Sequence, residues 1–330
     1  MGYVLAVVGA SGLVGQAFLK LLKERDILIK DLRLFGNESV GKTFFWCGKE
    51  YFFQPLSEGC FDGCDFIFLF CSAKISEVCI EIAKSSDGIV IDNSSLKRMD
   101  KNVPLIVPEI NANAIGNSKI IANPNCTTAI CALPLFAISK QYKIESIEFC
   151  TYQSVSGCGK TGLQDLFDTR YGKKEKFFKY NVSETCIPKI DEVGEQNYTF
   201  EEWKMVNETK KIFNNYFLKI GATCIRVPVA NCHAVSVFVK LKNEFLLDNI
   251  KQALCNEREI IVLDDLKNDI YPVSTLASGK TEVFVGRIRE CLYDKTALLF
   301  YVLSDNLLRG AAYNAYLIME YLINRNNDSL

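Results

Sequence analysis

The sequence is short of the residues and runs that mark several classes of protein. Only one of its 330 residues is a histidine, His233, so any imidazole chemistry must use that side chain. No long run of one charge sign occurs and the formal net charge is -1, which argues against a nucleic-acid binder and against a polybasic membrane surface. No apolar run is long enough to span a bilayer.

The cysteines, although 14 in number, lack the spacing of common metal and redox sites. None forms a CxxC pair, and Cys60-x-x-x-Cys64 has no second pair of ligands, so we expect no metal. The first residues run directly into an apolar strand, with no basic segment or cleavage site of a signal peptide. We therefore expect a cytoplasmic protein with reduced, mostly buried thiols.

The start of the chain has the pattern of a dinucleotide-binding unit. Tyr3 to Val8 is a continuous apolar run, typical of a strand buried in a parallel sheet. Gly9-Ala-Ser-Gly-Leu-Val-Gly15 follows, and residues 16–23 have helical spacing, so the turn can bring a pyrophosphate to a helix N-terminus. A tight turn without a ligand is the alternative. The cofactor-binding candidates are Gly9, Ser11, Gly12, Leu13 and Val14.

The rest of the chain predicts two domains. Strands at 31–35, 65–71 and 88–92 alternate with helices at 77–84 and 127–140, which indicates a parallel, Rossmann-like sheet. After about residue 145 the pattern changes to an α+β substrate and dimerisation domain, with strands near 144–155, 222–229 and 235–242 and a helix at 200–213. A helix at 306–321 returns to the first domain. We place the first domain at 1–125 plus 306–330 and the second at 126–305.

Cys126 is the candidate nucleophile. It follows Pro124 and Asn125 and precedes an apolar helical stretch, and a helix N-terminus can lower the pKa of a thiol and hold an oxyanion. His233 would be its acid/base partner, since a thiol attacks carbonyl carbon as thiolate. A structural thiol with Asn125 as a plain helix cap is the alternative.

Other polar residues are expected to meet the same site. Gln153 ends a predicted strand, and Glu201 and Lys204 share one helical face at i and i+3, where a solvated surface pair is the alternative. Arg98 follows a strand end, the place where α/β proteins bind ligands, and Arg226 lies seven positions before the histidine (233 − 226 = 7).

Ordered motifs over nearly the whole chain resemble the aspartate-semialdehyde dehydrogenase family. They include Val8-Gly-Ala-Ser-Gly-Leu-Val-Gly15, Asn123-Pro-Asn-Cys-Thr-Thr128, Tyr152-Gln-Ser-Val-Ser-Gly157, Tyr198-Thr-Phe-Glu-Glu-Trp-Lys-Met205, Cys224-Ile-Arg-Val-Pro-Val229 and Ser304-Asp-Asn-Leu-Leu-Arg-Gly-Ala-Ala312. The resemblance implies a fold of the glyceraldehyde-3-phosphate-dehydrogenase-like type. It also implies reductive dephosphorylation of L-aspartyl 4-phosphate to L-aspartate 4-semialdehyde with NADPH, in the biosynthesis of lysine and diaminopimelate, threonine and methionine.

By the same resemblance, Cys126 would form a thioester, His233 would be the general acid/base and Gln153 would orient the acyl group. Arg226 would bind the substrate carboxylate and Glu201 its ammonium. Arg98 and Lys204 would bind the departing phosphate. These charges match a substrate with one carboxylate, one ammonium and one phosphoryl group.

The cofactor is the main departure from the family. NADP is the family's dinucleotide, but Glu38 aligns with a basic residue that pairs with the 2′-phosphate in many bacterial relatives. A carboxylate there favours the ribose 2′-OH of NAD. Alternatively, Glu38 faces solvent and Ser39 or Lys42 handles the phosphate. The resemblance adds Ser156, Gly157 and Asn306 to the cofactor site.

The remaining expectations concern partners and rivals. The family suggests a homodimer or homotetramer that acts on a small-molecule substrate and inorganic phosphate, with no nucleic acid and no membrane as partner. A shortened segment between Gly159 and Pro188 would alter a subunit interface or a lid. The rivals are an N-acetyl-glutamyl-phosphate reductase-like enzyme and a non-catalytic dinucleotide-binding homologue. Asn125, where the former usually has glycine, and the retained Cys126 and His233 speak against them.

Overall fold

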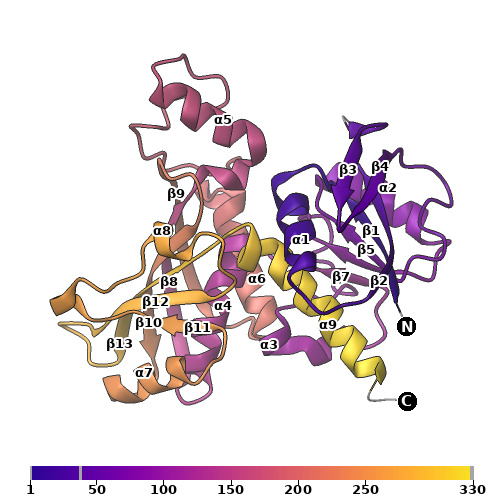
Figure 1. Ribbon diagram of the computed structural model, residues 1–330. Helices are drawn as coiled ribbons and strands as arrows, with labels where there is room; N and C mark the ends of the chain where they lie inside the picture. The colour runs from indigo at the N-terminus through magenta and orange to yellow at the C-terminus, as the bar shows by residue number, and fades with distance from the viewer. Residues whose placement is uncertain (1, 37–38, 328–330) are drawn as a thin grey trace. The chain divides into compact units, whose positions relative to one another are not determined.

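The computed structural model describes residues 2–36 and 39–327, and the chain forms two compact units (Figure 1). The first unit combines Met1–Pro124 with Ala311–Leu330, and the second is the continuous stretch Asn125–Gly310. Each unit has its own sheet and helices. The expected fold class, a Rossmann-like α/β unit and an α+β unit, is confirmed.

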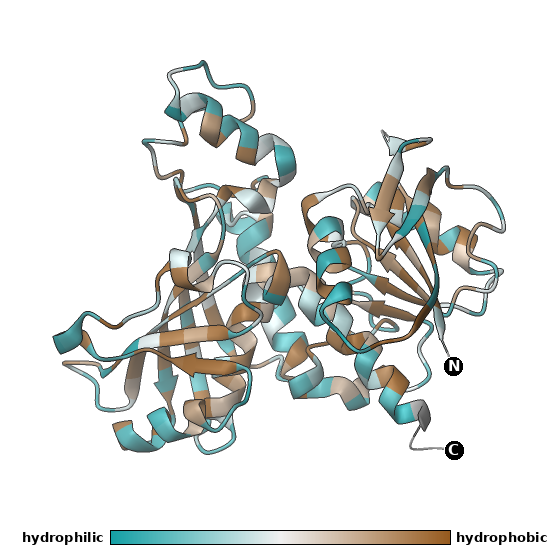
Figure 2. Ribbon diagram, in the orientation of Figure 1, coloured by the Kyte–Doolittle hydropathy of each residue, from teal (hydrophilic) through white to brown (hydrophobic). Residues whose placement is uncertain are grey.

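The first unit is built on a seven-stranded sheet with the order β3-β4-β2-β1-β5-β6-β7. Neighbouring strands are parallel except β3 and β4, which are antiparallel. Strands β1 and β5 are strongly hydrophobic in Figure 2, as expected for strands with both faces covered by helices. The strands are β1 (Tyr3–Val8), β2 (Ile29–Phe35), β3 (Thr43–Trp46), β4 (Lys49–Gln54), β5 (Phe66–Leu69), β6 (Ile89–Asp92) and β7 (Ile120–Ala122).

Among the described residues of the unit, four α-helices accompany this sheet. They are α1 (Leu13–Lys23), α2 (Ala73–Ala83), the single turn α3 (Pro108–Asn111) and α9 (Tyr313–Asn327). α9 is held in the first unit because Asn314 Nδ2 donates to the carbonyl oxygen of Ile106 at 2.9 Å. Within residues 2–36 and 39–327, no helix is both long enough and apolar enough to cross a bilayer.

The expected helix over 306–321 is wrong at its beginning. Leu308–Ala312 forms a π-helical turn, and α9 begins only at Tyr313. The carboxylate of Asp305 caps this turn, because it accepts hydrogen bonds from the backbone N–H groups of Leu307 at 2.9 Å and Leu308 at 3.2 Å. The turn is wider than an α-helix because the backbone N–H of Gly310 donates to the carbonyl oxygen of Asp305, five residues earlier, at 3.2 Å.

The second unit has a mixed six-stranded sheet with the order β11-β12-β13-β10-β8-β9. The four strands β12, β13, β10 and β8 are antiparallel neighbours. The edge strands β11 and β9 run parallel to their neighbours β12 and β8. The strands are β8 (Ile144–Gln153), β9 (Lys219–Arg226), β10 (His233–Leu241), β11 (Ile260–Val262), β12 (Val283–Glu290) and β13 (Ala297–Ser304). The helices are α4 (Cys126–Ser139), α5 (Gly159–Arg170), α6 (Phe200–Ile212), α7 (Leu247–Cys255) and α8 (Ser274–Ala277).

Helix α4 is the centre of the second unit. It is buried along nearly its whole length, and its side chains join those of β8, β10, β12 and β13 in one hydrophobic core. A helix that is apolar all round is stable only when other elements cover every side. Because Cys126 is its first residue, the nucleophile candidate stands on a helix that is packed into the core of the unit.

The thiols are less buried than expected. All 14 cysteines lie in the part of the chain that the structure describes, and all are free thiols. The prediction of mostly buried thiols is wrong, because several lie in turns or at element ends, as Cys47, Cys186 and Cys255 do. The buried ones are Cys64, Cys79, Cys131, Cys224, Cys232 and Cys291.

Candidate active site

Cys126 lies at the N-terminus of α4, as the sequence predicts, and Asn125 caps this helix. The Oδ1 atom of Asn125 accepts hydrogen bonds from the backbone N–H groups of Thr127 at 3.0 Å and Thr128 at 3.2 Å. These two donors are therefore committed to the cap, and an oxyanion formed at Cys126 must rely on other donors. Asn125 is therefore a helix cap, and Cys126 stands at the helix N-terminus beside it.

Two buried carboxylates of α6 hold Asn125 in turn. Glu201 accepts from the Asn125 side chain (Nδ2 to Oε1, 2.9 Å), and Glu208 accepts from its backbone N–H (2.6 Å). Glu208 is not among the predicted site residues, although it lies in the same helix seven residues after Glu201 (208 − 201 = 7), a spacing that returns to the same helix face. That spacing was the signal available for finding it.

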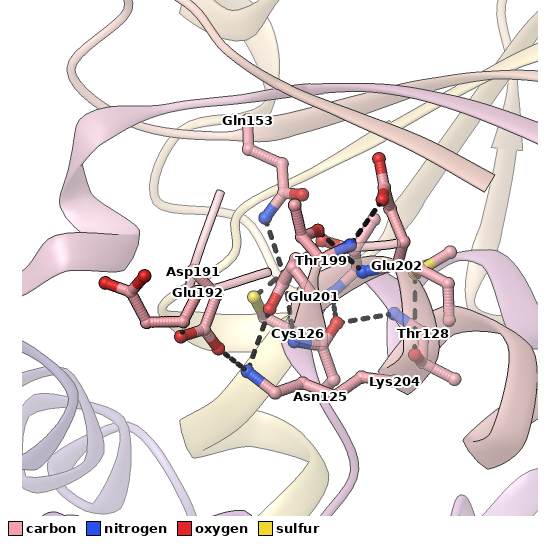
Figure 3. Close-up of polar contacts among 12 residues, drawn as sticks. Asn125, Cys126, Thr128, Gln153, Asp191, Glu192, Thr199, Glu201, Glu202 and Lys204 are labelled. Carbon is pink, nitrogen blue, oxygen red and sulfur yellow. Dashed lines mark hydrogen bonds and ion pairs between the residues drawn. The ribbon is translucent and has the colours of Figure 1, made fainter. Parts of the chain in front are cut away.

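Glu201 also joins Gln153 and Lys204 in one polar chain, drawn in Figure 3. Gln153 Nε2 donates to Glu201 Oε1 at 3.0 Å, and Lys204 Nζ lies 3.0 Å from Glu201 Oε2 and 2.8 Å from Asp191 Oδ2. The surface-pair alternative is wrong for Glu201, which is 5% exposed because α6 packs this face inward.

The charge of this buried glutamate is stabilised by its neighbours. Burial alone would raise the pKa of Glu201, but Lys204 and the hydrogen bonds from Asn125 and Gln153 outweigh it and lower the pKa to about 2. Burial likewise opposes the charge of Lys204, yet Glu201 and Asp191 raise its pKa above the usual value. Both groups are therefore ionised at neutral pH.

His233 is fully buried at the start of β10, and its hydrogen bonds define its tautomer. The backbone N–H of Ser154 donates to Nδ1 at 3.0 Å, so Nδ1 must be the acceptor and the neutral ring carries its proton on Nε2. Burial and then the charge of Arg226 lower the pKa of His233 to about 3. Nε2 is buried and has no hydrogen-bond partner among the described residues, which leaves an N–H donor free for a ligand.

Arg226 and His233 face the same space above Gly157. The Nη1 atom of Arg226 donates to the carbonyl oxygen of Ser154 at 2.5 Å. A Cβ atom on Gly157 would lie 3.2 Å from Arg226 Nη1 and 3.2 Å from His233 Nε2. Glycine at this position therefore keeps open the space into which both nitrogen atoms point.

Gly310 packs directly against the nucleophile candidate. A Cβ atom there would lie 2.7 Å from the Cβ of Cys126 and 3.0 Å from its Cα. Real Cβ atoms do not approach this closely, so the turn at Leu308–Ala312 fits against Cys126 only because residue 310 is glycine. Gly310 contacts a residue that is distant in sequence, so no local sequence pattern identifies its importance.

Ser156 and Asn306, expected at the cofactor, form a buried network in the second unit. Asn306 Nδ2 donates to Ser156 Oγ at 2.9 Å, and Ser154 Oγ donates to Asn306 Oδ1 at 3.0 Å. The Ser154 hydroxyl also lies 3.0 Å from Nδ1 of His233. The network therefore supports the imidazole from the side opposite to Nε2.

The glycine turn of the first unit suits a dinucleotide phosphate. Gly9 has a φ of 78°, and a Cβ atom on it would lie 2.1 Å from the carbonyl oxygen of Phe70. Helix α1 begins with Leu13 and Val14 after Gly12, and no side chain caps it, so its first N–H groups can meet a phosphate. Among residues 2–36 and 39–327, no group of three or more His, Cys, Asp and Glu side chains is placed to hold a metal ion.

The end of β2 lies next to this turn. A Cβ atom on Gly36 would lie 3.2 Å from Ser11 Oγ, so these two candidate cofactor segments meet. Ser39 is buried and its backbone N–H donates to the carbonyl oxygen of Gly36 at 3.1 Å. Glu38, on which the choice between NADP and NAD depends, lies outside the described residues.

Arg98 belongs to the first unit and is bound to backbone there. Its Nε donates to the carbonyl oxygen of Asn123 at 2.9 Å, and its Nη2 to that of Asn93 at 2.7 Å. Asn123 is three residues before Cys126 (126 − 123 = 3), so Arg98 fixes the chain that leads to the nucleophile candidate. The other candidate substrate residues, Gln153, Glu201, Lys204, Arg226 and His233, belong to the second unit.

Replacing His233 by asparagine is expected to flatten the dependence of stability on pH. The pKa of His233 is about 3 in the folded chain, against roughly 6.5 for an exposed imidazole. Between these values the unfolded chain binds the extra proton, so acidification from about pH 7.5 to 5 lowers the free energy of unfolding by about 2 kcal/mol through this residue alone. Urea unfolding of both proteins at the two pH values measures the free energy of unfolding. If acidification lowers it equally in both proteins, His233 does not have the lowered pKa.

Glu201 does not disturb this comparison. Its folded pKa of about 2 lies below that of an exposed carboxyl, so the stability it contributes is present above pH 4.5 and is lost only at lower pH. Other groups that titrate above about pH 5 are the same in both proteins and cancel in the difference.

Two family models match the chain, one in each unit. Residues 4–118 match the semialdehyde dehydrogenase NAD binding domain, and residues 135–309 match the semialdehyde dehydrogenase dimerisation domain. A protein of Aquifex aeolicus named aspartate-semialdehyde dehydrogenase is 38% identical over 335 residues, which cover 98% of each chain.

Solved structures agree with this relationship. The crystal structure of aspartate semialdehyde dehydrogenase II from Vibrio cholerae, complexed with ASA, has a TM-score of 0.93 and 34% identity and covers 98% of this chain and 99% of its own. An aspartate semialdehyde dehydrogenase from Candida albicans, solved with NADP, has a TM-score of 0.76 and 25% identity over 98% of this chain and 99% of its own.

Proposed function

The chain belongs to the aspartate-semialdehyde dehydrogenase family, and we propose that it reduces L-aspartyl 4-phosphate to L-aspartate 4-semialdehyde through a thioester on Cys126. The observation that carries this is the start of α4, where Cys126 directly follows Asn125, and Asn125 donates to Glu201 of the Gln153–Glu201–Lys204 chain. The relatives named above favour this function over the N-acetyl-glutamyl-phosphate reductase alternative. An oxidoreductase of this kind serves amino-acid biosynthesis.

The chemistry begins at the thiol. The thiol of Cys126 gives its proton to a phosphoryl oxygen of the substrate and its sulfur attacks the acyl carbon, so that an oxyanion forms. The bond from the acyl carbon to the phosphate oxygen then breaks, inorganic phosphate leaves with the proton, and a thioester remains. Because Asn125 uses the N–H groups of Thr127 and Thr128, the Nε2–H of His233 is the donor that we assign to the oxyanion. His233 thus acts as a hydrogen-bond donor to the oxyanion while its ring stays neutral. The bound nicotinamide dinucleotide supplies the hydride that converts the thioester to the aldehyde.

The charges of the second unit fit the rest of the substrate. Arg226 is 5% exposed and its Nη1 faces the open space above Gly157, where it can take the α-carboxylate. Glu201, ionised and buried, can take the ammonium group. Gln153 then orients the acyl group, while Lys204 receives the phosphate and leaves Asp191 to do so.

We assign the dinucleotide to the first unit and catalysis with dimerisation to the second. The uncapped N-terminus of α1 and the glycine turn that includes Gly9, Ser11 and Gly12 support the first assignment. NADP is the dinucleotide we propose, in line with the Candida albicans relative. The match to a dimerisation domain supports a homodimer, and a pair of such dimers would form the homotetramer.

A steady-state assay tests the proposal directly. The purified chain is expected to reduce NADP when given aspartate semialdehyde together with inorganic phosphate, and to reduce NAD less well. Omitting phosphate should stop the reaction, because the acyl group of the thioester then has no phosphate to which it can be transferred. Activity with N-acetylglutamate semialdehyde but none with aspartate semialdehyde would overturn the function, whereas a preference for NAD would overturn only the choice of dinucleotide.

A further inference from the structure

Asp191 is a carboxylate at the edge of the polar chain that Gln153, Glu201 and Lys204 form. Its Oδ2 atom lies 2.8 Å from Lys204 Nζ, and Glu201 Oε2 lies 3.0 Å from the same nitrogen, as Figure 3 shows. The two carboxylates differ in exposure, because the side chain of Asp191 is 38% exposed whereas Glu201 is buried. Lys204 therefore has one partner inside the protein and one that is open to solvent.

The backbone fixes Asp191 in this place. Its φ is 70°, in the left-handed region, and its Oδ1 atom accepts a hydrogen bond from the backbone N–H of Glu192 at 3.0 Å. Aspartate tolerates this conformation because its short polar side chain can bond the nearby backbone. The carbonyl oxygen of Glu192 accepts in turn from the backbone N–H of Phe200, the first residue of α6, at 2.8 Å. Asp191 is thus tied to the helix that carries Lys204.

Asp191 and a bound phosphate would compete for the same amine. An anion in hydrogen-bond contact with Lys204 Nζ lies within about 6 Å of Asp191 Oδ2 unless the ion pair opens, and the two negative charges repel each other at that distance. Glu201 cannot give way instead, because it is buried and also accepts hydrogen bonds from Asn125 and Gln153. Asp191 is therefore the partner that phosphate has to displace.

We propose that Asp191 sets the affinity of the site for phosphate by competing with it for Lys204. The inference rests on the proposed function, in which Lys204 receives the phosphoryl group. In the reductive direction, inorganic phosphate leaves once the thioester has formed, and Asp191 favours this release because it takes back the amine. In the oxidative direction, the same competition keeps the binding of phosphate weak. Asp191 is a positioning residue, since it acts through Lys204.

The variant Asp191→Asn removes the charge and little else. Asparagine has nearly the same shape, tolerates positive φ, and can accept the backbone N–H of Glu192. Burial lowers the pKa of Lys204, but Glu201 and then Asp191 raise it above the usual value, so Glu201 keeps the amine charged in the variant. The KM for inorganic phosphate in the oxidation of aspartate semialdehyde should fall by about fivefold, the size expected for loss of a partly exposed ion pair. The KM for aspartate semialdehyde and kcat should change by less than about twofold.

Glu192→Gln is the matched control. Glu192 lies next to Asp191, and its Oε2 atom bonds Lys189 Nζ at 3.3 Å, so this variant removes one charge from the same segment and leaves the contact with Lys204 intact. It should change the KM for phosphate by less than about twofold. An equal fall in both variants would indicate a general effect of net charge and would overturn the proposal. A higher KM for phosphate or a large fall in kcat in Asp191→Asn would also overturn it, because Asp191 would then merely hold Lys204 in place.

Phosphate binding measured without turnover separates this proposal from the proposed function. Isothermal titration calorimetry with inorganic phosphate should give a dissociation constant about fivefold lower for Asp191→Asn than for the wild-type protein. Equal dissociation constants, or no binding to either protein, would overturn the competition. If the wild-type protein does not oxidise aspartate semialdehyde, the proposed function fails, and the titration alone decides whether Asp191 competes with phosphate.

Discussion

Replacing Cys126 by alanine is expected to abolish phosphate-dependent oxidation of aspartate semialdehyde, with a loss on the order of 10⁴-fold or more in kcat. The reason is that the thioester cannot form, and no other thiol stands at the start of a helix beside Gln153 and Glu201 in the described part of the second unit. Cys126→Ser should also be nearly inactive, because a hydroxyl is a far weaker nucleophile than a thiol near neutral pH. Steady-state kinetics of the purified variants provides the measurement.

The chain offers a matched control in the same helix. Cys131 is also in α4 but is buried in the core, so Cys131→Ala should cost about 1 kcal/mol of stability as a small cavity and leave kcat close to normal. Circular dichroism and NADPH binding should show that Cys126→Ala is folded. Full activity in Cys126→Ala would disprove the covalent mechanism outright.

Gly310→Ala is expected to have the second largest effect. The new methyl group would lie 2.7 Å from the Cβ of Cys126 and 3.2 Å from its carbonyl oxygen, so the backbone at the nucleophile must move. A displacement of several tenths of an ångström is expected to lower kcat by about 100-fold. The alkylation rate of Cys126 with iodoacetamide should change as well, which reports on the thiol independently of turnover.

A glycine elsewhere separates this effect from general instability. Gly116 has a φ of 51° and open space around its Cα, so Gly116→Ala should cost about 1 kcal/mol through backbone strain without touching Cys126. If Gly310→Ala and Gly116→Ala lose similar amounts of activity, the contact between Gly310 and Cys126 has no special importance for turnover.

The parts of the site that the sequence could predict are those with local signals. Asn125 and Cys126 precede an apolar helical stretch, and this pattern alone places the thiol at a helix N-terminus. The pairing of Glu201 with Lys204 follows from their spacing of three residues. The apolar run of β1 before a glycine turn likewise predicts the beginning of a parallel sheet.

The parts that could not be predicted depend on contacts between distant residues. Glu208 bonds the backbone of Asn125 across 83 positions, and the protonated nitrogen of His233 is decided by a backbone N–H 79 positions away. Helix α5 has no apolar stripe, because polar side chains such as Asp165 and Thr169 are among those it buries. No pattern within a short window records such contacts.

The hairpin β3–β4 lacks a sequence signal for a different reason. Its two-residue turn is Cys47-Gly48, and both residues have positive φ, at 47° and 79°. This is the backbone of a tight hairpin turn, which asparagine or aspartate usually marks at its first position. Cys47 at the first position is not typical of such a turn, so the sequence does not indicate that the strands on either side form a pair.

Helix α6 carries several functions on one rigid element. Glu201, proposed to recognise the substrate, and Glu208, which holds the chain before the nucleophile, stand on the same helix, and a capping box of Thr199 and Glu202 fixes its first turn. Substrate recognition by Glu201 and positioning of the nucleophile by Glu208 are therefore coupled, since any tilt of the helix changes both together. For evolution this means that a new substrate cannot be acquired by remodelling α6 alone without loss of rate. Changes in specificity are easier at positions such as Arg226, on a separate strand.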